Sequence, residues 1–194
     1  NKNDNFIMSI NNFIEQRTMA GGRQRDRSLQ GVSNESKFVE CCNNNNIYWE
    51  PSTKDQDIRY HWDGFIKIDG ELRPYDSKSS KDSYEQDGLF LVEIKNVNGG
   101  EGWCNLTPDA PYWIAFHLRD RNAYFVVKNS DLYNCVYNPI VLHSTENIED
   151  AKRLKCGYSR GKYDNDDLMG FTDEETIKNK CLYKYYHIDP ENPR

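Results

Sequence analysis

The stretch DGFIKIDGELRPYDSK, residues 63–78, constrains the fold more than any other part of the chain. Its Asp69-Gly70 pair suits a two-residue hairpin turn with positive φ at both positions. Strands folded about this turn bring Asp63 directly opposite Asp76. Two carboxylates in that arrangement, with Cβ atoms roughly 5 Å apart, destabilise an ordinary sheet. A further group is therefore expected to hold the two acids together.

Length and composition indicate one globular domain. A chain of 194 residues can bury about 70% of the surface that its unfolded state exposes. The hydrophobic share of 37% is low, but an aromatic share of 13% argues against disorder. No apolar run approaches the roughly 20 residues that cross a membrane, and the first residues lack the apolar core of a signal peptide. We therefore expect no membrane partner and a cytoplasmic location.

Charge and cysteine spacing exclude several classes of protein. The net charge of -6 and the pI near 5.3 disfavour a protein that coats nucleic acid through its whole surface. The cysteines show no C-x-x-C pair and no histidine at the spacing of zinc ligands, which indicates structural or free thiols in a reducing interior. They are Cys41, Cys42, Cys104, Cys135, Cys156 and Cys181.

Two basic segments could make local contacts with phosphates. They are RTMAGGRQRDRSLQG, residues 17–31, and KRLKCGYSRGK, residues 152–162. Arg and Lys neutralise phosphates without reading sequence, whereas the alternative reading of each segment is a mobile, solvated stretch. The candidate nucleic-acid-binding residues are Arg23, Arg25, Arg27, Arg160 and Lys162.

Hydrophobic periodicity predicts a mixture of helices and strands. We expect an N-terminal helix and a flexible Gly/Arg-rich segment in residues 1–32, followed by a single domain in residues 33–194. Ser33 suits the N-cap of a helix that ends at the Asn-rich run from Asn43. The expected strands lie in the hairpin at 60–78, in GLFLVEIKNV at 88–97, in YWIAFHL, and in AYFVVKNSDLYNCV, which runs into a helix. One or two short helices and polar loops are expected in the last third.

A divalent cation would make the pairing of Asp63 with Asp76 favourable. Mg²⁺ takes hard oxygen ligands and often uses only one or two protein carboxylates, and Mn²⁺ has similar preferences. Lys78 follows Asp76 by two residues and so shares its face of the strand, where an ammonium can stabilise charge on phosphate. The helix after Ser33 offers Glu35 or Glu40 as a further carboxylate.

These residues resemble the PD-(D/E)XK nuclease pattern: a helix Glu, then Asp63, then Asp76-Ser77-Lys78. Five further blocks resemble, in order, members of that family from phages and bacteria: YHWDGF, YDSK, VEIKNVNGGEGW, APYWIAFHL and YSRGKYDNDDLMGFTDEE. The likeness covers residues 33–175. It implies a restriction-endonuclease-like α/β (α+β) fold, a mixed sheet flanked by helices. Trp62 stands where the pattern has Pro.

The resemblance implies a Mg²⁺- or Mn²⁺-dependent endonuclease that hydrolyses phosphodiester bonds, in DNA more than in RNA. Asp63 and Asp76 would bind the metal, and Lys78 and a helix acid, Glu35 before Glu40, would complete the site. If the chain is viral, it would act in the host cytoplasm. A homodimer is compatible with the sequence.

Several alternatives stay open at this level. Glu93 and Lys95 form a second acid-x-Lys pair that could replace Asp76 and Lys78 or line the same cleft. The chain could instead be a noncatalytic nucleic-acid-binding or protein-interaction protein on the same fold. An acidic mimic that fills another protein's nucleic-acid groove is a third reading. His61 shares the face of Asp63 but suits a structural role, and Trp103 suits a core or a cleft wall.

Overall fold

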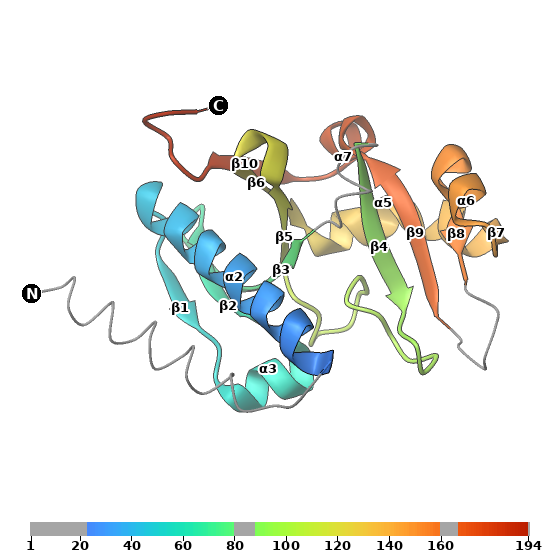
Figure 1. Cartoon of the computed structure of the whole chain (residues 1–194), viewed down its shortest axis with the longest axis horizontal. Coiled ribbons are helices and arrows are strands. Elements are labelled where there is room, and N and C mark those ends of the chain that lie inside the picture. The colour runs from blue at the N-terminus through green and yellow to red at the C-terminus, as the bar shows by residue number, and fades with distance from the viewer. Residues whose placement is uncertain (1–22, 80–87, 160–166, 194) are drawn as a thin grey trace, which may run out of the picture.

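The computed structural model describes residues 23–79, 88–159 and 167–193, with side chains from residue 34 onward. Two mixed sheets and several helices make an α+β fold, which confirms the sheet-plus-helix class that the sequence predicts (Figure 1). The larger sheet has the order β1-β2-β3-β5-β6-β10, and the smaller has the order β4-β9-β8-β7. No helix in the described ranges is long and apolar enough to cross a membrane.

The bounds of the elements are as follows. The strands of the larger sheet are β1 (Trp49–Pro51), β2 (Gly64–Ile68), β3 (Glu71–Ser79), β5 (Trp113–Leu118), β6 (Ala123–Lys128) and β10 (Tyr183–His187). Those of the smaller sheet are β4 (Leu89–Lys95), β7 (Ser144–Thr145), β8 (Gly157–Tyr158) and β9 (Leu168–Asp173). The helices are α2 (Arg23–Asn44), α3 (Lys54–Tyr60), α5 (Asn129–Leu142), α6 (Ile148–Leu154), α7 (Glu174–Lys180) and the 3-10 turn η1 (Arg119–Arg121).

The hairpin of β2 and β3 forms with the register that its turn predicts. Asp69 and Gly70 have φ values of 51° and 87°, so both turn residues adopt the left-handed conformation that this turn requires. The strands pair Phe65 with Pro74 in antiparallel fashion. On its other edge, β3 pairs in parallel with β5. The strand that carries Asp76 is therefore internal to the larger sheet.

The helix before the hairpin is longer than the sequence analysis expects. It begins at Arg23, so Ser33 lies inside it and does not cap it. Arg, Gln and Leu are good helix formers, and a single Gly such as Gly31 costs a helix only about 1 kcal/mol. The predicted end is confirmed, because α2 stops at Asn44. The helix expected at residues 5–16 lies outside the described residues.

The expected strands at 88–97, in YWIAFHL and in AYFVV are present as β4, β5 and β6, and the last runs directly into α5. Several elements were not predicted from the sequence, namely the strands β1, β7, β8, β9 and β10 and the helix α3. For α3 a signal was present, because Thr53 and Gln56 form a capping box at its first turn. The strand β10 reads YKYYH, which has no alternation of polar and apolar residues to reveal it.

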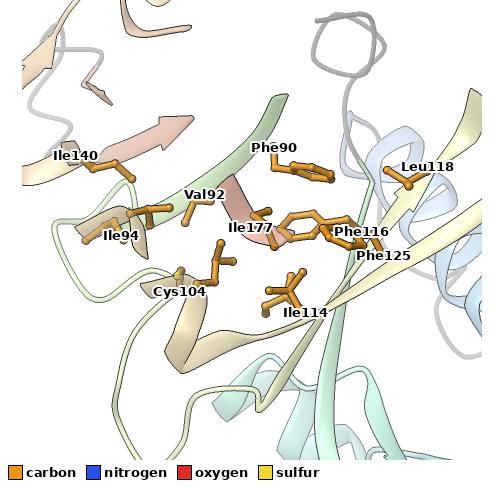
Figure 2. Packing of buried hydrophobic residues seen from close by; sticks show 13 residues of the cluster. Phe90, Val92, Ile94, Cys104, Ile114, Phe116, Leu118, Phe125, Ile140 and Ile177 are labelled. Carbon is orange, nitrogen blue, oxygen red and sulfur yellow. The ribbon is translucent and has the colours of Figure 1, made fainter. Parts of the chain in front are cut away.

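Two hydrophobic clusters lie on opposite faces of the larger sheet. One lies under α2, where Phe38 contacts Tyr75 of β3 and Tyr124 of β6 with ring centroids 4.7 and 4.8 Å apart. The other joins the two sheets and α5. Figure 2 shows this second cluster, in which Phe90 of β4 lies 4.8 Å from Phe116 of β5 between ring centroids. The smaller sheet therefore packs on the face of β5 that points away from α2.

Candidate functional site

Strand β3 presents Asp76 and Lys78 on the side of the larger sheet away from α2. Successive residues of a strand point to opposite faces, and Tyr75 packs under α2 against Phe38. In the parallel pairing with β5, Asp76 aligns with Ile114, which belongs to the cluster between the two sheets. The hairpin thus carries its acid and its lysine toward the junction of the sheets.

Asp76 and Lys78 form an ion pair at this junction. The Lys78 Nζ lies 2.5 Å from the Asp76 Oδ2; the Lys78 side chain is 30% exposed and the Asp76 side chain 5%. The same ammonium lies 5.2 Å from the centroid of the Trp103 ring, within the range of a cation–π contact. The lysine therefore joins a buried carboxylate to an aromatic side chain on the connection between β4 and β5.

The Asp76 carboxyl group has an unusual affinity for its proton. Burial raises its pKa from 3.8 to about 7, since desolvation penalises the charged form. The Lys78 ammonium lowers this pKa, while the negative charges of Asp63 and Glu93 raise it. The charges of Asp63, Glu93 and Lys78 thus all act on the Asp76 carboxyl group.

Asp63 lies one residue before β2, where β3 continues without that partner strand. Its carboxylate accepts hydrogen bonds from the Ser77 backbone N–H at 2.8 Å and from the Ser77 hydroxyl at 2.7 Å. The Asp63 carboxylate thereby accepts the Ser77 N–H bond that the backbone carbonyl of a partner strand would otherwise accept. Its charge raises the pKa values of both Asp76 and Tyr75, which lie on opposite faces of β3. Asp63 therefore lies at the N-terminal end of β2, where its charge acts on both faces of β3.

Glu93 reaches the same region from β4 in the smaller sheet. Burial raises the pKa of its carboxyl group, Asp167 raises it further, and Lys78, His61 and the backbone of Trp103 lower it. The chain after β4 turns back and pairs along its edge, with Gly102 N–H donating to the Ile94 carbonyl at 2.9 Å. A Cβ at Gly102 would lie 2.4 Å from the Glu93 carbonyl oxygen, so only Gly fits this close approach.

A pocket of about 680 Å³ opens beside Lys78 and Glu93. Its walls come from the end of α3 and from the connection between β4 and β5, which lie near each other in the lower half of Figure 1. Lys78 and Glu93 line it together with aromatic and polar residues from both walls. The ion pair of Asp76 and Lys78 thus adjoins a cavity of the size that binds small ligands, roughly 300–1,000 Å³.

The remaining predicted residues occupy other positions. Glu35 is buried on α2, one turn before Phe38, and its charge raises the pKa of Tyr75, after the larger effects of burial and of Asp63. Glu35 therefore lies on the α2 side of the sheet, whereas Glu40 and Lys95 are exposed.

Of the predicted nucleic-acid-binding residues, Arg23, Arg25 and Arg27 lie on the first turns of α2, but their side chains are not described. Arg160 and Lys162 lie outside the described residues.

Two groups near the site have no role in the sequence analysis. Asp167, the residue before β9, is 2% exposed, and its charge raises the pKa of Glu93. Tyr60, at the end of α3, lines the pocket. Tyr60 could be placed only by recognising α3 from its capping box. Asp167 belongs to the run DNDD, in which the sequence offers no signal to separate the buried acid from its neighbours.

Among the described residues, no group of three or more His, Cys, Asp or Glu side chains is arranged to hold a metal ion. The acids whose charges act on Asp76 are Asp63 and Glu93. Comparisons with protein-family models, with curated proteins and with solved structures found no match.

Proposed function

We propose that the protein is a Mg²⁺- or Mn²⁺-dependent endonuclease that hydrolyses phosphodiester bonds, in DNA more than in RNA. The observation that carries the proposal is the buried ion pair of Asp76 and Lys78, which adjoins a pocket and has Asp63 and Glu93 nearby. Perturbed pKa values of convergent groups beside a cavity are typical of active sites. The resemblance of Asp63 and Asp76-Ser77-Lys78 to the PD-(D/E)XK pattern points to the same chemistry.

The residues near Lys78 fit a divalent cation. Asp63 and Asp76 supply hard carboxylate oxygens, and Mg²⁺ commonly binds through one or two carboxylates with water and phosphate. The raised pKa of Asp76 supports this assignment, because a carboxylate desolvated beside other acids gains most from a bound cation. When bound, the ion would lower the pKa of a water molecule and polarise a phosphoryl oxygen.

The protein side chains have separate roles in this proposal. Asp63 and Asp76 would hold the cation, and the Ser77 hydrogen bonds would fix the orientation of Asp63. The Lys78 ammonium would leave Asp76 for the phosphate and offset the negative charge that develops there. Glu93 would line the same cleft as an auxiliary acid. Glu35 would support the site from the α2 side of the sheet.

The cysteines support a reducing compartment for this activity. All six are free thiols, and all lie in the described part of the chain. Burial raises the pKa of Cys41 to about 12, which keeps this thiol protonated and unreactive. We therefore place the protein in the cytoplasm.

The test is a cleavage assay with single-stranded, duplex and branched DNA and RNA in Mg²⁺ or Mn²⁺. The wild-type protein should cut at least one substrate, and Asp76→Asn should abolish cutting. Asp120→Asn, which changes an exposed acid on η1, should retain it. Metal binding without cleavage of any substrate would favour a noncatalytic binding protein. Cleavage that survives in Asp76→Asn but is lost in Glu93→Gln would move the site to β4.

A further inference from the structure

The pocket beside Lys78 has aromatic side chains from two separate segments. Tyr60 comes from the end of α3, and Trp103 comes from the connection between β4 and β5. Lys78 and Glu93 complete the lining near the ion pair. Aromatic side chains are the groups on which proteins stack nucleobases, because every base has a π-face.

The Tyr60 ring packs against Trp62 and also lines the pocket. Its ring lies 4.7 Å from the ring of Trp62, between centroids, with an interplanar angle of 31°. The Trp62 Nε1–H donates to the Asp109 carbonyl at 2.9 Å, and its ring also contacts Phe65. The Tyr60 hydroxyl makes no hydrogen bond with any residue in the described ranges. Tyr60 is therefore an aromatic side chain that Trp62 supports at the border of the pocket.

The other wall of the pocket, the connection between β4 and β5, is held in shape by hydrogen bonds of its own Asn side chains. The Asn96 side chain accepts from the Asn98 N–H at 2.9 Å and donates to the Glu101 carbonyl at 3.1 Å. The Asn105 side chain accepts from the Thr107 N–H at 2.8 Å. The bond between Trp62 and Asp109 joins this wall to the end of α3. The pocket is thus formed before any ligand arrives, as is usual for small-ligand sites.

The charges of the pocket favour a base over a second phosphate. Its lining includes the carboxylates of Glu93, Glu101 and Asp109 against the cations of Arg59 and Lys78. Carboxylates away from Lys78 would repel a phosphate, but they can accept hydrogen bonds from the amino groups of bases. A nucleotide would therefore place its phosphate near Lys78 and its base toward Tyr60.

We infer that this pocket binds one unpaired nucleobase next to the phosphodiester bond that is cut, with the base stacked on Tyr60. A base inside a duplex is stacked on both faces by its neighbours, so a side chain reaches its face only when the nucleotide is unpaired or flipped out. The substrate class is accordingly nucleic acid that is single-stranded at the cleavage position. This inference rests on the proposed nuclease function for the position of the bond, but its binding test does not require cleavage.

The experiment measures binding of a short fluorescent single-stranded oligonucleotide and of its duplex by anisotropy, with Ca²⁺ in place of Mg²⁺. Tyr60→Ala should weaken single-strand binding about tenfold, the scale of losing one stacked base. Tyr60→Phe should bind like the wild type, because the ring remains. Tyr48→Ala, which removes a tyrosine that is 57% exposed outside the pocket, serves as the matched control and should have no effect.

The outcomes separate this inference from the proposed function. Equal single-strand binding by the wild type and Tyr60→Ala would overturn the inference, as would tighter binding of the duplex than of the single strand. Cleavage of duplex with a KM that Tyr60→Ala leaves unchanged would also overturn it, while the nuclease proposal would stand. Tyr60-dependent single-strand binding without cleavage in Mg²⁺ or Mn²⁺ would keep the pocket and refute the nuclease.

Discussion

The raised pKa of Asp76 predicts a specific effect of Asp76→Asn on stability. In the metal-free protein the pKa rises from 3.8 to about 7, chiefly through burial. A carboxyl group with a raised pKa in the folded state stabilises the fold least when it is ionised. Its contribution is therefore lost progressively as the pH rises from the unfolded pKa through the folded pKa. At pH values above the folded pKa, the ionised Asp76 carboxylate lowers the free energy of unfolding by about 4 kcal/mol in full.

The change with pH can be worked out from the same two pKa values. Between about pH 5 and about pH 8, the ionisation of Asp76 should lower the free energy of unfolding by about 2.5 kcal/mol. Asn has no such ionisation. The free energy of unfolding of Asp76→Asn minus that of the wild type should therefore increase by that amount over the range. This difference cancels any constant cost of the substitution.

The assay is urea unfolding in EDTA across the pH range, with Asp120→Asn as the control. That control changes an exposed acid, so its difference from the wild type should stay nearly constant. Saturating Mg²⁺ at the upper end of the range should stabilise the wild type but not Asp76→Asn, by about 2.7 kcal/mol at a hundredfold excess over Kd. A difference between Asp76→Asn and the wild type that does not change with pH would refute the reasoning.

Three further predictions concern the residues around the pair. Lys78→Ala should retain metal binding by calorimetry but lose turnover by about 100-fold, the scale of one lost transition-state contact, whereas exposed Lys67→Ala should keep its rate. Gly102→Ala should cost about 1–3 kcal/mol in urea unfolding, because its Cβ would meet the Glu93 carbonyl at 2.4 Å. Asn129→Ala should cost about 1–3 kcal/mol, because buried Asn129 donates to the carbonyls of Trp103 and Pro111; wild-type stability would contradict it.

The hairpin could be predicted from the sequence because its determinants are local. The turn pair Asp69-Gly70 sets the register, and the register sets the position of Asp63 relative to β3. The side chain of Asp63 could not be predicted in the same way. Its carboxylate accepts hydrogen bonds from Ser77 just outside the first residue of β2. The residue at which a strand begins or ends depends on its contacts with neighbouring segments.

The position of Glu93 was open in the sequence for a different reason. Alternation placed Glu93 and Lys95 on a strand correctly, but no pattern states which sheet a strand joins. In the structure β4 pairs with β9, about eighty residues away in the chain, and not with β3. A β-bulge between Glu93 and Lys95 also breaks the alternation that the acid-x-Lys pattern assumes. Only long-range packing makes Glu93 a neighbour of Lys78.

The site therefore depends on how the two sheets pack together. Asp76 and Lys78 belong to the larger sheet, and Glu93 belongs to the smaller one. Phe116 aligns with Lys78 across β3 and β5, and its ring lies 4.8 Å from Phe90 of β4 and 6.2 Å from Trp103. Because close-packed interiors transmit small displacements, the same aromatic contacts that stabilise the core set the separation of the lysine from the second acid. A substitution that shifts Phe90 or Phe116 in the core should therefore also shift Lys78 relative to Glu93.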